Sequence, residues 1–257
     1  MNRQLCLLAL CAGCGSVQSP PPDDGAVGVD LARGCVLKAQ LDETSWPATG
    51  DPVVNGCGGA GGHLTGSGAM PAADGVRGRV GSFSGTACID FASSPSLHGT
   101  TGLTMSAWIR PTALDNVTSN GIVTKRLDRS VQSEYSLFVW TGNHAWVDFG
   151  DSDRFSGTAA LTNNVWVQLT AVFDGSRAMT DRVRLFINGV PDALQHATIG
   201  NLGTTLPSYD APVHVGCTPA PSAMPATQQT FTGDLDNVTV WNRALSEDEI
   251  VQLYHNG

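Results

Sequence analysis

Charged side chains are scarce in this chain, and so are long apolar runs. Of its 257 residues, 14% are charged and 7% are aromatic, whereas glycine occurs 30 times. Long helices and disordered segments are usually rich in charge, so this composition favours short strands joined by turns. After the first residues, no apolar run is long enough to cross a bilayer.

The sequence also lacks the usual signatures of nucleophilic catalysis. It contains no Gly-x-Ser-x-Gly elbow, and its six histidines are scattered singly. We expect His98 and His144 in loops and His214 inside a strand, each as an ordinary structural residue.

An excess of acidic side chains gives the chain a net charge of −9. This charge disfavours nucleic acid and anionic lipid as electrostatic partners. It is compatible with neutral glycans, with cationic surfaces and with calcium.

Residues 1–14 have the pattern of a secretory signal. Arg3 supplies a positive start, residues 5–10 are apolar, and small residues precede Cys14. The apolar stretch is too short to span a bilayer. We therefore expect an exported protein, located in the cell envelope or on the outer surface.

The cysteine that follows these small residues resembles the lipidated cysteine of a bacterial lipobox. Cys11 stands where leucine is usual, and plain cleavage near Gly15 is the alternative. Residues 15–34 are polar and proline-rich, which is typical of a semi-extended tether. Lipid on Cys14 would anchor the mature chain to a membrane surface by acyl chains alone.

Four further cysteines lie beyond the tether: Cys35, Cys57, Cys88 and Cys217. In an exported protein, four such cysteines indicate two disulfides. A zinc site is disfavoured, because none of them forms a Cys-x-x-Cys pair. Three pairings are possible, and the sequence does not choose between them. We favour Cys35 with Cys57, which closes a local loop, and Cys88 with Cys217, which would clip two strands together.

Strand-like runs are spread evenly from residue 35 to the end, which favours one domain over residues 35–257. The run 165–173 alternates apolar and polar residues and ends at Asp174-Gly175, and Asn188-Gly189 is a second hairpin signal. Strands joined by such turns predict two antiparallel sheets around one core. The other predicted strands are residues 83–91, 103–110, 122–126, 135–140, 145–149 and 183–187.

The closing segment, residues 231–257, combines a strand and a helix. Val238 and Val240 share one strand face, but Leu235 is out of phase with them, which predicts a bulge at Asp236 and Asn237.

The helix begins with a capping box formed by Ser246 and Glu249, and Leu245 can pack on Ile250. One face is expected to hold the apolar residues Ile250, Val251, Leu253 and Tyr254.

This closing segment, Phe231-x-Gly-x-Leu-Asp-x-Val-x-Val-Trp-Asn-Arg-Ala-Leu-Ser-x-x-Glu-Ile-x-x-Leu-Tyr254, resembles the end of the LamG-like jelly-roll family of concanavalin A-like domains. The resemblance extends over roughly residues 35 to 257. It implies an all-β jelly-roll sandwich with a short C-terminal helix, here in a bacterial exported lipoprotein. The other matching segments are Cys88-Ile-Asp-Phe91, residues 103–111, 121–125, 166–175 and 183–189, and Val213-His-Val-Gly216.

The resemblance also implies a position for structural calcium, which prefers oxygen ligands. Asp236 matches the family's acidic position in the closing strand. Residues 36–43 resemble the family's opening strand, and Asp42 or Glu43 at its end can reach Asp236 if the first and last strands are neighbours. The alternative is that these are solvated carboxylates or turn caps. We interpret a second acidic group as a polar hairpin tip: Asp148, Asp151 and Asp153.

Aromatic side chains near turns are candidates for stacking on sugar rings. Trp140 and Trp146, together with Asn143 and His144, form a possible glycan surface, and Trp46 is also free to be exposed. Two further tryptophans match core positions of the family and are expected to pack: Trp108 and Trp166.

Many concanavalin A-like proteins are glycoside hydrolases, which need two carboxylates around one glycosidic bond. Apart from Glu247 and Glu249 in the helix, only Glu43 and Glu134 are available as glutamates, and neither lies in the hydrolase motif Glu-x-Asp-x-x-Glu. The sequence therefore predicts a non-catalytic cell-surface module that binds carbohydrate. The alternatives are a glycan-cleaving enzyme and a structural protein that binds another surface protein.

The calcium hypothesis predicts that calcium raises the thermal midpoint of the protein. A ligand that binds only the folded state stabilises it by mass action. Melting curves recorded with millimolar calcium and with chelator test this, and coincident midpoints would count against the site.

Overall fold

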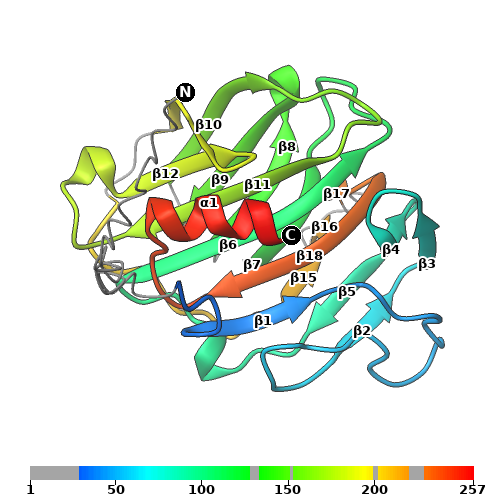
Figure 1. The fold of residues 1–257 in the computed structure, drawn as a ribbon. Helices are drawn as coiled ribbons and strands as arrows, with labels where there is room; N and C mark the ends of the chain where they lie inside the picture. The colour runs from blue at the N-terminus through cyan, green and yellow to red at the C-terminus, as the bar shows by residue number, and fades with distance from the viewer. Residues whose placement is uncertain (1–28, 128–132, 151–152, 199–201, 220–228) are drawn as a thin grey trace, which may run out of the picture.

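The computed structural model describes residues 29–127, 133–150, 153–198, 202–219 and 229–257. Two large antiparallel sheets lie face to face, and one helix, α1 (Glu247–Asn256), lies on the outer side of the first sheet (Figure 1). The expected all-β jelly-roll sandwich with a C-terminal helix is confirmed. Within the described residues, no helix is long and apolar enough to cross a membrane.

The first sheet has the strand order β13-β12-β11-β6-β18-β4-β3, and β1 also pairs with β18. The last strand thus lies in the middle of this sheet, between strands from much earlier in the chain. The strands are β1 (Cys35–Ala39), β3 (Ala69–Asp74), β4 (Gly78–Phe83), β6 (Gly102–Pro111), β11 (Val167–Asp174), β12 (Val183–Ile187), β13 (Val190–Asp192) and β18 (Gly233–Trp241).

The second sheet has the order β14-β10-β9-β8-β7-β15-β5-β2, and a small separate pair, β16-β17, follows β15 in the chain. The strands are β2 (Gly62–Thr65), β5 (Cys88–Phe91), β7 (Asn120–Arg126), β8 (Ser133–Trp140), β9 (His144–Phe149), β10 (Asp153–Ala160), β14 (Leu194–Thr198), β15 (Val213–Val215), β16 (Cys217–Thr218) and β17 (Gln229–Thr230). In the part of the chain that the structure describes, three short 3-10 helices connect strands: Pro95–Leu97, Thr141–Asn143 and Met179–Asp181.

Alternating side chains from both sheets form one hydrophobic core. In β11, Leu169, Ala171 and Phe173 are fully buried, as their period of two predicts. Val165 is 52% exposed, because β11 begins only at Val167.

The prediction of one strand over residues 83–91 is wrong. The chain turns between β4 and β5, so these strands belong to opposite sheets.

The predicted bulge in the closing strand is confirmed. The pairing of β18 with β6 shifts register between Asp236 and Thr239, and Asn237 adopts a positive φ of 49°. A left-handed residue at this point bends the strand, and asparagine tolerates that conformation better than most residues.

The predicted capping box is confirmed too. The Ser246 hydroxyl accepts a hydrogen bond from the Glu249 amide, and the Glu249 carboxylate accepts one from the Ser246 amide. Leu245 and Ile250 join Trp241 in a small apolar cluster under the helix. Val251, expected on the packed face, is 42% exposed, so that part of the prediction is wrong.

Both favoured disulfides are present. Cys35 pairs with Cys57 and Cys88 with Cys217, with Cα atoms 5.6 and 5.4 Å apart. The second bond links β5 to β16 across 129 residues.

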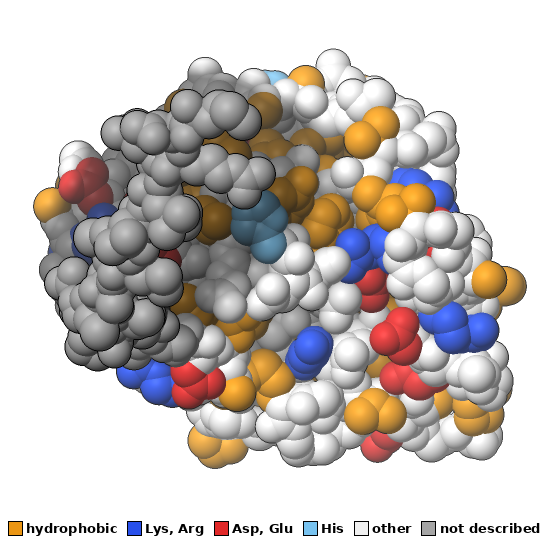
Figure 2. All heavy atoms as spheres, viewed as in Figure 1, with side chains coloured by type: hydrophobic (Ala, Val, Ile, Leu, Met, Phe, Trp, Pro, Cys, Tyr) orange, Lys and Arg blue, Asp and Glu red, His pale blue; other side chains and the backbone are white. Residues whose placement is uncertain are grey.

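On the face that carries α1, basic side chains lie next to acidic ones. Figure 2 shows basic and acidic side chains beside one another there, not gathered into a patch of one sign. Arg110 contacts Asp74 at 2.9 Å and Asp234 at 2.7 Å, and Arg77 contacts Asp236 at 2.5 Å.

Removing the helix cap tests how far α1 depends on it. We expect Ser246→Ala to lower the free energy of unfolding by about 1 kcal/mol, since the first turn loses a partner for its free N–H groups. Denaturant unfolding measures this. Ser45→Ala is the control, because Ser45 is exposed and makes no side-chain hydrogen bond within the described residues; an equal loss in both variants would contradict a role for the cap.

Candidate functional site

An aromatic cluster lies on the outer face of the second sheet. Phe138 and Trp140 alternate along β8 with the core residues Leu137 and Val139, so they point away from the core. Trp146 pairs with Phe138 across the β8-β9 ladder. The ring centres of Trp140 and Trp146 are 5.1 Å apart, so the hairpin brings the two predicted sugar-binding tryptophans into contact.

Paired charges flank these rings. Asp148, on β9, is 4% exposed and accepts hydrogen bonds from Arg126 of β7 at 3.1 Å and from Arg154 of β10 at 2.7 Å. The hydrogen bond to Asp148 raises the pKa of Arg154, and burial opposes it. The guanidinium carbon of Arg154 lies 5.5 Å from the ring centres of both Phe138 and Trp140, a cation–π distance.

Asp148 and Asp153 lie where β9 and β10 pair as a hairpin, as the interpretation as a polar hairpin tip expects, but they do not form a solvated tip. Both belong to strands and are buried, 4% and 7% exposed respectively, because strand pairing places them against neighbouring side chains. Asp151 lies outside the described residues.

A cavity of about 200 Å³ opens between these rings and the β16-β17 pair. Among the described residues, its wall carries aromatic, guanidinium, hydroxyl and amide groups but no carboxylate. These residues are Ser119, Arg126, Phe138, Trp140, Arg154, Thr218 and Gln229. Such a wall offers an apolar platform with hydrogen-bond donors and acceptors around it.

The loop before β7 holds Trp140 in place. The Trp140 indole donates to the Val117 carbonyl at 2.7 Å, and the Asn116 amide donates to the Asn143 side chain at 2.9 Å. Asn143, a predicted ligand residue, is thus used to fix this loop, and His144 lies opposite Trp140 in the β8-β9 ladder. Trp140 is partly exposed, whereas Trp146 is buried and donates to the Thr141 carbonyl.

Two of the three predicted calcium ligands, Asp236 and Glu43, already have hydrogen-bond partners. Asp236 is 2% exposed and bonded to Arg77. Burial raises the pKa of Asp236, Arg77 opposes the rise, and the charge of nearby Asp42 adds to it. The Glu43 carboxylate accepts hydrogen bonds from Trp46 at 3.0 Å and from the Val54 amide at 2.8 Å. Calcium at Asp236 would compete with the Arg77 guanidinium, and its binding stays a prediction.

The other tryptophans pack in different places. Trp46 packs against the core, and its ring centre lies 6.3 Å from that of Phe83. Trp108 stacks on Tyr254 of α1 at 5.5 Å, on the outer face of the first sheet. Trp166 lies 5.1 Å from the Arg110 guanidinium. Trp108 and Trp166 therefore pack as expected, but outside the core between the sheets.

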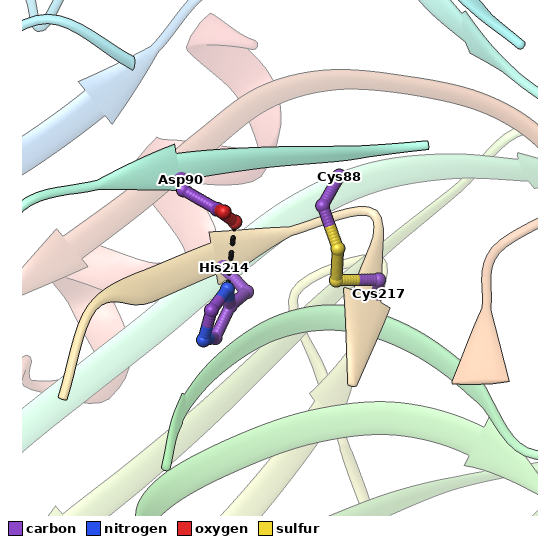
Figure 3. Close-up of side chains that lie close together, drawn as sticks. All are labelled: Cys88, Asp90, His214 and Cys217. Carbon is purple, nitrogen blue, oxygen red and sulfur yellow. Dashed lines mark hydrogen bonds and ion pairs between the residues drawn. A yellow bond between two sulfur atoms is a disulfide. The ribbon is translucent and has the colours of Figure 1, made fainter. Parts of the chain in front are cut away.

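A second group with metal-binding atoms lies at the β5-β15 pair (Figure 3). Its two sulfurs form the Cys88–Cys217 disulfide, and His214 bonds Asp90 at 2.7 Å. Thr65 donates to the other oxygen of Asp90 at 3.1 Å. These side chains satisfy one another, which agrees with the expectation for His214.

Sequence reasoning missed a buried ionic network at the beginning of β8. Glu134 is fully buried and contacts the Lys125 ammonium at 3.3 Å and the His98 ring at 2.9 Å. Lys125 also donates to the carbonyls of Tyr209 and Ala211 at 2.7 and 2.9 Å. Burial lowers the pKa of Lys125, and the charge of Glu134 opposes that shift. The network ties two loops to the second sheet.

Comparisons with known proteins agree on the fold. The profile described as the concanavalin A-like lectin/glucanases superfamily matches residues 83–251. A comparison with curated proteins gave no match.

Among solved structures, domain 4 of AbnA, a GH43 extracellular arabinanase from Geobacillus stearothermophilus in complex with arabinotriose, is similar with a TM-score of 0.60 at 17% identity. The match covers 86% of this chain and 98% of that one.

Toxin binding domains are also similar. That of Paraclostridial Mosquitocidal Protein 1 has a TM-score of 0.62 at 14% identity, and the match covers 88% of this chain and 53% of the other, so this chain spans about half of that domain. Botulinum neurotoxin type C, whose cell entry depends on two ganglioside molecules, has a TM-score of 0.59 at 13% identity, with 87% and 51% covered.

The loop that holds Trp140 depends on Asp115, which predicts a pH effect. Hydrogen bonds from the Thr118 hydroxyl, the Thr118 amide and the Val117 amide lower the pKa of Asp115 from 3.8 to about 2. Since the folded-state pKa is the lower one, the carboxylate stabilises the loop above its ordinary pKa and stops doing so as the pH falls towards 2. We expect tryptophan emission to shift in that window.

Asp115→Ala should show the shifted emission already at neutral pH. Asp181→Ala is the control, because Asp181 is exposed and its carboxylate makes no hydrogen bond within the described residues. Identical emission of both variants and the parent across the acid range would refute this role of Asp115.

Proposed function

The chain belongs to the concanavalin A-like lectin/glucanase superfamily, and from this premise we propose that it is a non-catalytic surface module that binds carbohydrate through the outer face of β7–β10. The observation that carries the proposal is the cavity beside Trp140, with a partly exposed indole and hydrogen-bonding groups around it.

The chemistry of this wall suits a sugar. The apolar C–H face of a pyranose or furanose stacks on an aromatic ring, and its hydroxyls need donors and acceptors at the edge. Trp140 provides the ring, and Arg154, Thr218 and Gln229 provide polar groups around it. The hydrogen bond from Trp140 to Val117 fixes the ring before a ligand arrives, which lowers the entropic cost of binding.

The relatives of known structure support a binding role. The arabinanase domain was solved with arabinotriose, and the type C neurotoxin depends on gangliosides. A related neurotoxin binding domain, with a TM-score of 0.61, was solved with synaptotagmin II, a protein. A protein partner is therefore the second candidate function, and a flat partner would cover the outer sheet face more widely than the cavity.

Hydrolysis at this site has weaker support. A general acid must exchange a proton with its substrate, and a second carboxylate must lie about 5 to 10 Å away. Asp148 accepts hydrogen bonds from both Arg126 and Arg154 and is 4% exposed, so its oxygens are already engaged and little of it faces the cavity. This arrangement favours a role in orienting the arginines.

We also propose that the module works outside the cytoplasm. Two disulfides suit an oxidising compartment. Export by residues 1–14 and lipid on Cys14 would hold it at the cell envelope, and a structural calcium ion at Asp236 is compatible with that setting.

A glycan panel tests the proposal. We expect the parent protein to bind at least one glycan and Trp140→Ala to weaken that binding by tenfold or more, about 1.4 kcal/mol, because the stacking platform is lost. Met70→Ala on β3 is the control, since it removes a side chain that is 61% exposed on the other sheet.

Reducing-end release should be measured on the same glycans. Binding without release supports the module, whereas release that persists over time would favour the enzyme. If no glycan binds and a surface protein is retained through the Trp140 face, the second candidate function replaces the first.

A further inference from the structure

A second and larger cavity lies on the opposite side of the sandwich. It has a volume of about 490 Å³ and lies between the outer face of β6 and β18, the Cys35–Cys57 disulfide and the end of α1. Volumes of this size hold small-molecule ligands. The Trp140 cavity belongs to the other sheet and shares none of its lining residues.

The bulge in β18 shapes this cavity. Asn237, at positive φ, and Thr239 lie on its wall, at the point where β18 departs from regular pairing with β6. Bulges often lie beside functional sites because they redirect side chains out of the sheet register.

Two buried polar atoms in the wall lack partners within the described residues. Gln168 is 2% exposed; its amide nitrogen donates to the Leu253 carbonyl at 3.4 Å, but its carbonyl oxygen accepts no hydrogen bond. The indole nitrogen of Trp108 is likewise buried without an acceptor. A buried unpaired polar group costs about 1 to 3 kcal/mol, so each of these atoms would be stabilised by a hydrogen-bond partner that a bound molecule supplied.

The remaining wall narrows the chemistry of that molecule. The Trp108 ring stacks on Tyr254 with ring centres 5.5 Å apart, and the Arg77 guanidinium carbon lies 4.2 Å from its ring centre, so these two side chains already occupy positions where a sugar ring would stack. Among the described lining side chains there is no carboxylate, and Lys38 is the only charged one. Ser106, Asn237 and Thr239 add neutral hydroxyl and amide groups. The cavity would therefore hold a ligand mainly by hydrogen bonds to neutral groups, and less by aromatic stacking or ion pairing.

We infer that this cavity is a second ligand site, which takes a neutral hydroxyl-bearing molecule of the size of a mono- or disaccharide. The ligand would donate a hydroxyl proton to the Gln168 carbonyl oxygen and accept a hydrogen bond from the Trp108 indole. This site is independent of the one proposed at Trp140.

Saturation-transfer NMR with glucose, galactose, arabinose and N-acetylglucosamine as probes tests the inference on the whole protein. We expect at least one probe to bind Trp140→Ala as well as it binds the parent. Gln168→Met, which keeps the volume but removes the acceptor, should raise the dissociation constant of that probe by about fivefold to tenfold, equivalent to one lost hydrogen bond.

Trp108→Phe provides a second variant, because it keeps the ring between Tyr254 and Arg77 but lacks the N–H. Gln195→Met is the matched control, since Gln195 is exposed on β14. The melting temperature gives an independent readout: without ligand, Gln168→Met should be at least as stable as the parent, because an unpaired buried oxygen is removed.

The outcomes separate the two sites. Binding that is lost in Gln168→Met and kept in Trp140→Ala supports the cavity. Binding that is lost only in Trp140→Ala overturns it and leaves the proposed function standing. Failure of every probe to bind Trp140→Ala also overturns the inference. A marked drop in the stability of Gln168→Met overturns it too, because the amide would then be structural.

Discussion

The pairing of β18 with its neighbours is the constraint on which the first sheet depends. This strand forms ladders with β6, β4 and β1, so a segment near residue 240 joins segments near residues 37, 81 and 106. Without it, β6, β11 and β12 would have no hydrogen-bonded link to β3 and β4. The bulge at Asp236 and Asn237 separates the part of β18 that pairs with β4 from the part that pairs with β1, and it lies beside the cavity at Thr239.

Buried charges in this domain are arranged in opposite pairs that join distant segments. Arg77 meets Asp236 across 159 residues, and Glu134 meets Lys125 under two loops. In the protein interior such pairs give little net stability, but loss of one partner leaves an unmatched charge, which is costly. They therefore fix which segments lie together, as Asp148 does for Arg126 and Arg154 beside the aromatic cluster.

Features set by neighbours in sequence could be predicted, whereas features set by strand pairing could not. The capping box at Ser246, the bulge at Asp236 and the contact of Trp140 with Trp146 each follow from residues a few positions apart. The placement of Arg126 and Arg154 around Asp148 depends on the register of three ladders, which no local pattern specifies. The prediction of β4 and β5 as one strand overlooked a Ser-Gly turn signal at residues 84 and 85, between Phe83 and Cys88. The alternation of Phe138, Trp140 and Trp146 with core residues was the signal that could have placed Phe138 in the site.

The Cys88–Cys217 bond closes a covalent ring around half of the chain. Both loops that position Trp140, at residues 112–119 and 141–143, lie inside this ring. A protease that cuts once in either loop would leave two pieces still joined through the sulfurs and still paired in the sheets. For a protein exposed to extracellular proteases, the loops around the cavity can thus be nicked without release of a fragment.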